Sequence, residues 1–200
     1  MIKTLIFDLG GVYFTDGNAR AMGIFSSRYH IPHEKVRDVL NGDLGSQYRL
    51  GAITPIEFWE KAKGLWDVST PIPELSLTWL KEYTPIPETV AIVKKLRSAG
   101  FETLFLSDNA PDRIEYLQQN YGFLEHFKDG VFSHMVHVRK PDIKIYQAAL
   151  NKASSSPEEC VYIDDKPELL RPAIALGMKG IVFENPAQLA KELRNLGVKF

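Results

Sequence analysis

Short apolar segments alternate with helix-length segments along residues 84–200, and this alternation restricts the possible folds more than any other feature of the chain. The apolar segments have the length of strands and lie at residues 102–106, 131–136, 159–163 and 180–183. Helical patterns fill the intervals at residues 88–99, 112–120, 142–152, 168–176 and 186–196. Strands that alternate with such helices favour right-handed crossovers. We therefore expect an α/β fold with a doubly wound, Rossmann-like parallel sheet that helices cover on both faces.

The first predicted strand lies near the start of the chain, within the stretch IKTLIFDLGGVYF at residues 2–14. Its apolar run ends at Asp8, and Gly10 and Gly11 follow closely. A buried strand that delivers a carboxylate to its C-terminal tip, beside a flexible turn, is the usual layout of an active site in an open α/β sheet. Asp8 is therefore the first candidate catalytic residue.

Residues 19–83 carry helical patterns and no clear strand, so we expect four helices there. The strongest start signal is Thr54, with Pro55 at the first helical position and Glu57 three residues after the cap. Prolines 85 and 87 mark the return of the chain. We predict a core domain of residues 1–15 and 84–200, with a small helical cap domain of residues 16–83 inserted after the first strand.

The composition is that of an ordinary globular protein and excludes several classes of partner. The chain is 44% hydrophobic and 24% charged, with a formal net charge of −1, so no basic excess attracts nucleic acid or a membrane surface. Cys160 is the only cysteine, which rules out an intramolecular disulfide. No leader-like or transmembrane-length apolar stretch is present. We expect a cytoplasmic protein with a small-molecule partner, and the oligomeric state stays open.

Polar residues follow the predicted strands at several places. Asp8, the triplet Ser107–Asp108–Asn109 and the pair Asp164–Asp165 each come after an apolar run, and Lys140 precedes a helix. The C-terminal ends of parallel strands share one rim, so these groups can converge. Carboxylates on one rim repel each other unless a cation lies between them, and oxygen-only ligands favour Mg²⁺. A carboxylate beside a metal ion and a lysine is a plausible nucleophile that forms an aspartyl-phosphate.

Four of these stretches resemble, in order, the motifs of the haloacid dehalogenase (HAD) superfamily, and the resemblance extends over nearly the whole chain. The stretches are FDLGGV, LFLSDN, RKPD and YIDD. The helical insert lies where that superfamily places a small α-helical cap. The motifs look most like the branch that contains sugar-phosphate phosphatases and the N-terminal phosphatase domains of epoxide hydrolases. The resemblance implies a Mg²⁺-dependent phosphohydrolase that acts on a small phosphorylated metabolite.

The resemblance also implies a role for each motif residue. Asp8 would be the nucleophile and Lys140 its catalytic partner, which also binds the phosphoryl group. The implied metal ligands are Asp8, the backbone carbonyl of Gly10, Asp164 and Asp165. The implied substrate-binding residues are Ser107, Asp108, Asn109 and Lys140. Three residues near the inner connections of the cap, Tyr13, Tyr48 and Arg49, are further candidates for substrate contact.

Two positions depart from the family pattern. Gly10 stands where the family usually has a second Asp that acts as general acid and base, and glycine cannot transfer a proton. Asp16 and Asp108 are candidate substitutes, and a slow reaction or a substrate with a good leaving group would also fit. Leu169 stands where another acid or amide is common, with Glu168 beside it.

Gly10 leaves two alternative functions open. The first is a metal-independent dehalogenase, which also uses an Asp nucleophile without the second Asp. The adjacent Asp164 and Asp165 argue against it, because a metal-free reaction has no need of crowded acids. The second is a non-catalytic protein that binds a phosphate ligand.

Overall fold

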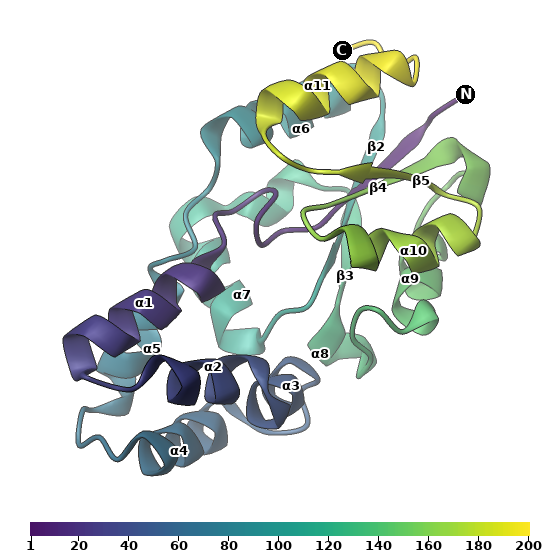
Figure 1. The fold of residues 1–200 in the computed structure, drawn as a ribbon. Helices are drawn as coiled ribbons and strands as arrows, with labels where there is room; N and C mark the ends of the chain where they lie inside the picture. The colour runs from purple at the N-terminus through teal and green to yellow at the C-terminus, as the bar shows by residue number, and fades with distance from the viewer.

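A computed structural model describes all residues from 1 to 200 and has at its centre a five-stranded, entirely parallel sheet (Figure 1). The strands run in the order β3-β2-β1-β4-β5. Their bounds are β1 Thr4–Phe7, β2 Glu102–Ser107, β3 Asp129–Phe132, β4 Cys160–Asp164 and β5 Lys179–Val182. Phe7 at the end of β1 lies opposite Phe105 in β2 and Ile163 in β4. The tips of the three central strands therefore meet at one rim, and the expected α/β fold is confirmed.

Helices cover both faces of the sheet, because successive strand residues point to opposite sides. Phe7 and Phe105 belong to a large apolar cluster, whereas their neighbours Ile6 and Leu104 belong to a second one. The first cluster includes α6 Pro87–Ser98 and α11 Pro186–Asn195, and the second includes α9 Ile143–Leu150 and α10 Pro167–Ala175 (Figure 1). The remaining elements of the core are α7 Pro111–Tyr121, η1 Phe123–His126, α8 Ser133–Val136 and η2 Pro157–Glu159. No helix combines the length and apolar character needed to cross a bilayer.

The chain between β1 and β2 forms five helices. These helices lie together as a separate group at the lower left of Figure 1. They are α1 Gly17–Tyr29, α2 His33–Asn41, α3 Asp43–Arg49, α4 Pro55–Trp66 and α5 Ile72–Leu80. Buried aromatic rings pack between them, with Trp59 against Phe58 at 5.0 Å and against Trp79 at 5.8 Å between ring centroids. The capping box predicted at Thr54 and Glu57 is present at the start of α4. This group occupies the predicted cap, and the domain boundaries themselves stay a prediction.

The helix α3 is an element that the pattern Asn41–Gly42–Asp43 did not predict. The expected break lasts one residue, because Gly42 is extended and Asp43 already begins the next helix. An acid in the first turn is favourable for a helix. Arg49, at the end of α3, donates from Nη1 to the carbonyl groups of Leu40 and Gly45 at 2.9 and 3.1 Å and so holds α3 against α2.

The strand predicted at residues 131–136 is correct only in its first part. β3 ends at Phe132, the last residue with a partner in β2, and α8 follows at once. The reason is Ser133, a fully buried residue whose hydroxyl donates to the Arg49 carbonyl at 2.6 Å and accepts from the Asn109 backbone N–H at 3.0 Å. These bonds turn the chain away from the sheet and bring it against α3.

Candidate active site

Asp8 lies directly after β1, where its backbone N–H continues the ladder by donating to the Ile163 carbonyl at 2.8 Å. Its side chain is buried, with 8% exposed. The Lys140 Nζ lies 2.9 Å from Asp8 Oδ1 and 2.8 Å from Asp164 Oδ2, so one buried ammonium group bridges two carboxylates. Residues 132 positions apart in the sequence are thus paired at the rim, because the loop before α9 and the tip of β1 end at the same place.

The hydrogen bonds of Asp164 differ from those of its neighbour Asp165. Asp164 accepts from Lys140 and, at 2.5 Å, from the Tyr162 hydroxyl on one oxygen, and from the Lys166 N–H at 2.9 Å on the other. Asp165 Oδ1 is buried and has no hydrogen-bond partner. Both oxygens of Asp164 are therefore used within the protein, whereas Asp165 keeps an oxygen free.

The carboxylates of Asp8, Asp164 and Asp165 each bring one oxygen within 4.8 Å of the others. The backbone carbonyl of Gly10 accepts no protein hydrogen bond and lines the same pocket. Gly11 has φ +91°, and a Cβ there would lie 2.6 Å from Asp165 Oδ2, so the close approach of this carboxylate requires glycine. An all-oxygen donor set with one orphaned carboxylate oxygen fits Mg²⁺.

Three carboxylates face one lysine in this cluster, so negative charge is in excess. Burial and the charges of Asp164 and Asp165 raise the pKa of Asp8 to about 7, although Lys140 opposes the shift. The pKa of Asp165 is also raised, by burial and by Asp164. Burial would raise the pKa of Asp164, but the charge of Lys140 and the hydrogen bonds from Lys140, Tyr162 and Lys166 together outweigh burial and lower this pKa. One lysine therefore does not neutralise the cluster, and a cation would stabilise it.

Ser107 ends β2, and Asp108 and Asn109 follow it; all three line the same pocket, each with a different set of contacts. The Ser107 hydroxyl makes no protein hydrogen bond, so it is free to donate to a ligand. Asp108 accepts from Arg139 Nε at 3.0 Å and from the Lys140 N–H at 3.1 Å. Asn109 Oδ1 accepts from the Ala110 N–H at 3.1 Å. Asp108 thus holds the segment that carries Lys140.

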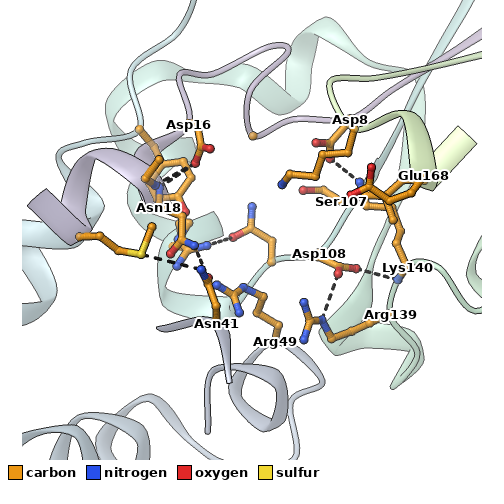
Figure 2. A pocket seen from close by; sticks show the side chains of 18 residues that line it. Asp8, Asp16, Asn18, Asn41, Arg49, Ser107, Asp108, Arg139, Lys140 and Glu168 are labelled. Atoms are coloured by element: carbon orange, nitrogen blue, oxygen red, sulfur yellow. Dashed lines mark hydrogen bonds and ion pairs between the residues drawn. The ribbon is translucent and has the colours of Figure 1, made fainter. Parts of the chain in front are cut away.

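The pocket above these residues has a volume of about 400 Å³ and lies between the rim and the cap helices. Figure 2 shows Asp8 and Lys140 on one side and Asp16, Asn41 and Arg49 around the rest. Of the three cap-side candidates, only Arg49 lines it. The other two, Tyr13 and Tyr48, are buried elsewhere, where their hydroxyls bond to His126 and Asp112. The prediction that Tyr13 and Tyr48 contact the substrate is therefore wrong, because neither lines the pocket.

The two candidate substitutes for the missing acid, Asp16 and Asp108, line the pocket, but each carboxylate already interacts with other groups of the protein. Asp16 caps α1 by accepting from the N–H groups of Asn18 and Ala19 at 3.1 and 3.0 Å, and Asp108 pairs with Arg139. Glu168 and Leu169, from the position of the second departure, line the pocket as well. Arg113 is a lining residue that the motifs did not predict, because only the packing of α7 against the cap brings it there.

Curated relatives of the chain include several phosphatases. The sesquiterpene phosphatase astK of Aspergillus oryzae is 25% identical over 97% of this chain and 96% of its own length. The phosphoserine phosphatase of Thermus thermophilus is 26% identical over 56% of this chain and 45% of its own. The bifunctional epoxide hydrolase 2 of Mus musculus is 31% identical over 52% of this chain, which spans only 20% of that larger protein.

Solved structures with the same fold include a HAD family enzyme, bt-2542 of Bacteroides thetaiotaomicron. Its magnesium complex has a TM-score of 0.81 and is 22% identical, with 95% of this chain and 98% of that one covered. A further structure of the same enzyme contains magnesium and inorganic phosphate and has a TM-score of 0.78. The family model for haloacid dehalogenase-like hydrolases matches residues 2–177. The chain therefore belongs to the haloacid dehalogenase-like hydrolases.

Proposed function

We propose that this hydrolase is a Mg²⁺-dependent phosphatase that acts on a small phosphorylated metabolite, such as a sugar phosphate, with Asp8 as the nucleophile. The observation that carries the proposal is the pair of contacts from Lys140 Nζ to Asp8 and Asp164, beside the orphaned oxygen of Asp165. The magnesium and phosphate bound by the related enzyme of B. thetaiotaomicron, and the named activities of two relatives, point the same way.

The reaction would proceed in two displacements at phosphorus. In the first, an Asp8 oxygen attacks the phosphoryl group, the bond to the alcohol oxygen breaks, and the leaving oxygen takes a proton from solvent water. In the second, water attacks the phosphorus of the aspartyl-phosphate, which releases inorganic phosphate and restores the Asp8 carboxylate. Lys140 and the free Ser107 hydroxyl would bind the phosphoryl oxygens, and their charge and hydrogen bonds stabilise the transition state.

Asp8, Asp165 and the Gly10 carbonyl would hold the metal ion directly, and Asp164 would act mainly by fixing Lys140. When bound, Mg²⁺ would neutralise the charge that the carboxylates and the phosphoryl group bring together. Gly10 supplies no proton, so the proposal favours substrates whose leaving group needs little protonation.

The crowded carboxylates support this metal-dependent reaction over a metal-independent dehalogenase. A reaction without a cation leaves the half-buried Asp165, with its buried Oδ1, beside two other acids and with nothing to compensate its charge. The free Ser107 hydroxyl and the open pocket of about 400 Å³ suit a phosphate ligand, and phosphate release distinguishes a phosphatase from a non-catalytic protein that only binds such a ligand.

The test is phosphate release from a broad panel of phosphorylated metabolites, assayed with Mg²⁺ and with a chelator. We expect release that requires Mg²⁺ and that Asp8→Asn abolishes, while its far-ultraviolet circular dichroism stays that of the wild type. Release that is equal with the chelator, or equal in Asp8→Asn, would overturn the proposal. Release of halide from a haloacid under the same conditions would favour the dehalogenase instead.

A further inference from the structure

Two buried arginines line the cap side of the pocket, opposite the phosphoryl-binding residues. Arg49, at the end of α3, is 6% exposed, and Arg113, in α7, is 1% exposed. Neither forms an ion pair with an acid, whereas the other buried or half-buried cations of the pocket, Lys140 and Arg139, pair with Asp8, Asp164 and Asp108. Buried charges are normally paired with an opposite charge. These two arginines are therefore unusual, because no acid in the protein supplies their counter-charge.

The donors of Arg113 are largely unused. Its guanidinium lies between two aromatic rings, with Cζ 4.2 Å from the centre of Trp79 and 4.4 Å from that of Tyr83. The rings cover its faces, but hydrogen bonds form in its plane. In that plane Nη1 donates to Asn109 Oδ1 at 3.3 Å, whereas Nε and Nη2 are buried without an acceptor. A buried guanidinium with orphaned N–H groups is costly unless a ligand supplies an acceptor.

Arg49 lies against the same tryptophan ring and uses only one nitrogen within the protein. Its Cζ is 5.9 Å from the ring centre of Trp79, and Nη1 alone donates, to two carbonyl groups. Burial and the neighbouring charge of Arg113 lower the pKa of Arg49 to about 10. The two guanidinium groups therefore repel each other, and an anion between or beside them would relieve that repulsion.

We infer that Arg49 and Arg113 form a second anion site, and that the substrate carries a carboxylate or a second phosphate group in addition to the phosphoryl group that is cleaved. The link to the phosphoryl site is Asn109, which bonds to Arg113 and lies two residues after Ser107. The inference rests on the proposed function for the position of the first phosphoryl group. It narrows the substrate class to small phosphate esters that carry a second anionic group.

The test uses non-hydrolysable ligands, so that it does not depend on turnover. Isothermal titration in Mg²⁺ compares alkylphosphonates with carboxyalkylphosphonates and alkanebisphosphonates of matched chain length. At the chain length that spans both sites, we expect the ligands with a second anionic group to bind at least about tenfold more tightly, as for a charge-assisted hydrogen bond. The second group that gives the tighter binding, carboxylate or phosphonate, is the one that we assign to the arginine site.

Arginine variants show whether that preference arises at this site. We expect Arg49→Met and Arg113→Met each to reduce the preference to about threefold or less, and Arg113→Lys to retain part of it. Arg20→Met removes a charge from an exposed position of α1 outside the pocket and should leave the preference intact. Thermal melting checks that each variant is folded.

Several results would overturn the inference. Equal affinity for the two series at every chain length in the wild type, binding of neither series, or an undiminished preference in both folded methionine variants would each do so. The wild-type series alone decides the matter if a variant fails to fold. Phosphate release without any preference would refute the anion site and leave the proposed function standing. A clear preference without phosphate release from the panel would support the anion site and refute the proposed function.

Discussion

At the scale of single residues, Gly10 governs where the protons of the reaction come from. A Cβ at this position would lie 3.8 Å from Tyr83 Cε1, an ordinary contact, so the backbone here accepts a Cβ without a clash. We expect Gly10→Asp to raise kcat by about a hundredfold or more for an unactivated alkyl phosphate, since general acid–base help is worth about two to four powers of ten. The gain should be smaller for p-nitrophenyl phosphate, because its leaving group needs no general acid and only the hydrolysis of the aspartyl-phosphate is assisted. Gly10→Asn is the control that adds bulk without a titrating group, and equal kcat in all three proteins would contradict the prediction.

Changing Asp164 or Asp165 to asparagine should affect different properties of the protein: its stability in the first case and its Mg²⁺ requirement in the second. Asp165→Asn removes a free carboxylate, so we expect the Mg²⁺ concentration for half-maximal activity to rise more than about tenfold with thermal stability in chelator unchanged or higher. Asp164→Asn breaks the buried pair with Lys140 and should lower the free energy of unfolding by about 3 kcal/mol. Metal titration and urea unfolding of both variants separate the two roles, and identical behaviour would refute the assignment.

Much of this residue-level arrangement follows from the sequence, because parallel strands bring their C-terminal tips to one rim. That rule is enough to expect Asp8, Ser107 and the two acids at the end of β4 together. It does not say which acid keeps a free oxygen, since that depends on Tyr162 and Lys166 hydrogen bonds. Arg113 has no motif of its own, and only the packing of α5 against α7 places it in the pocket.

At the scale of elements, the hydroxyl of Ser133 joins three segments: the loop after β2, the start of α8 and the end of α3. Ser133→Ala would leave the Asn109 N–H and the Arg49 carbonyl buried without this partner, at a cost of about 1–3 kcal/mol. We expect urea unfolding to show that loss and KM to rise, because both residues lie at the pocket. Ser133→Thr, which keeps the hydroxyl, is the comparison. Wild-type stability in Ser133→Ala would show that the contact is unimportant.

The elements that the sequence misplaced are those fixed by contacts between distant segments. The residues VFSHMV alternate like a strand, yet β2 offers partners only as far as Ser107, so the chain turns into α8. The break expected at Asn41–Gly42–Asp43 is bridged by Arg49 across α2 and α3. The start of α4, by contrast, depends on the local signals of Thr54 and Glu57 and was predicted correctly.

At the scale of the whole molecule, the two ends of the sheet have separate tasks. The carboxyl ends of the strands carry the pocket, whereas Glu102 at the amino end of β2 bonds to Thr4 at 2.6 Å, to the Ser154 N–H at 2.8 Å and to Lys128. Burial would raise the pKa of Glu102, but these hydrogen bonds outweigh it and lower the pKa from 4.5 to about 2. This network stabilises the sheet away from the chemistry.

Changing Glu102 should therefore alter stability and leave kcat and KM unchanged. We expect Glu102→Gln to lower the free energy of unfolding by about 1–2 kcal/mol at neutral pH, since part of the network is exposed to solvent. Because the folded pKa is depressed, the stabilisation is complete above pH 4.5 and is lost as the pH falls toward about 2. Urea unfolding of the two proteins at a series of pH values should show a difference that shrinks on acidification. A constant or growing difference would contradict the assignment.

The central claim is that the Asp8 carboxylate takes up the phosphoryl group, and trapping that adduct tests it most directly. The protein is mixed with p-nitrophenyl phosphate and Mg²⁺, quenched in acid during turnover and digested, and the peptides are analysed by mass spectrometry. Because Gly10 cannot activate water, hydrolysis of the adduct should be slow and the adduct should accumulate. We predict a phosphoryl group on Asp8 in the wild type and none in Asp8→Asn. Sustained phosphate release with no label on Asp8, or with the label on another residue, would contradict the account.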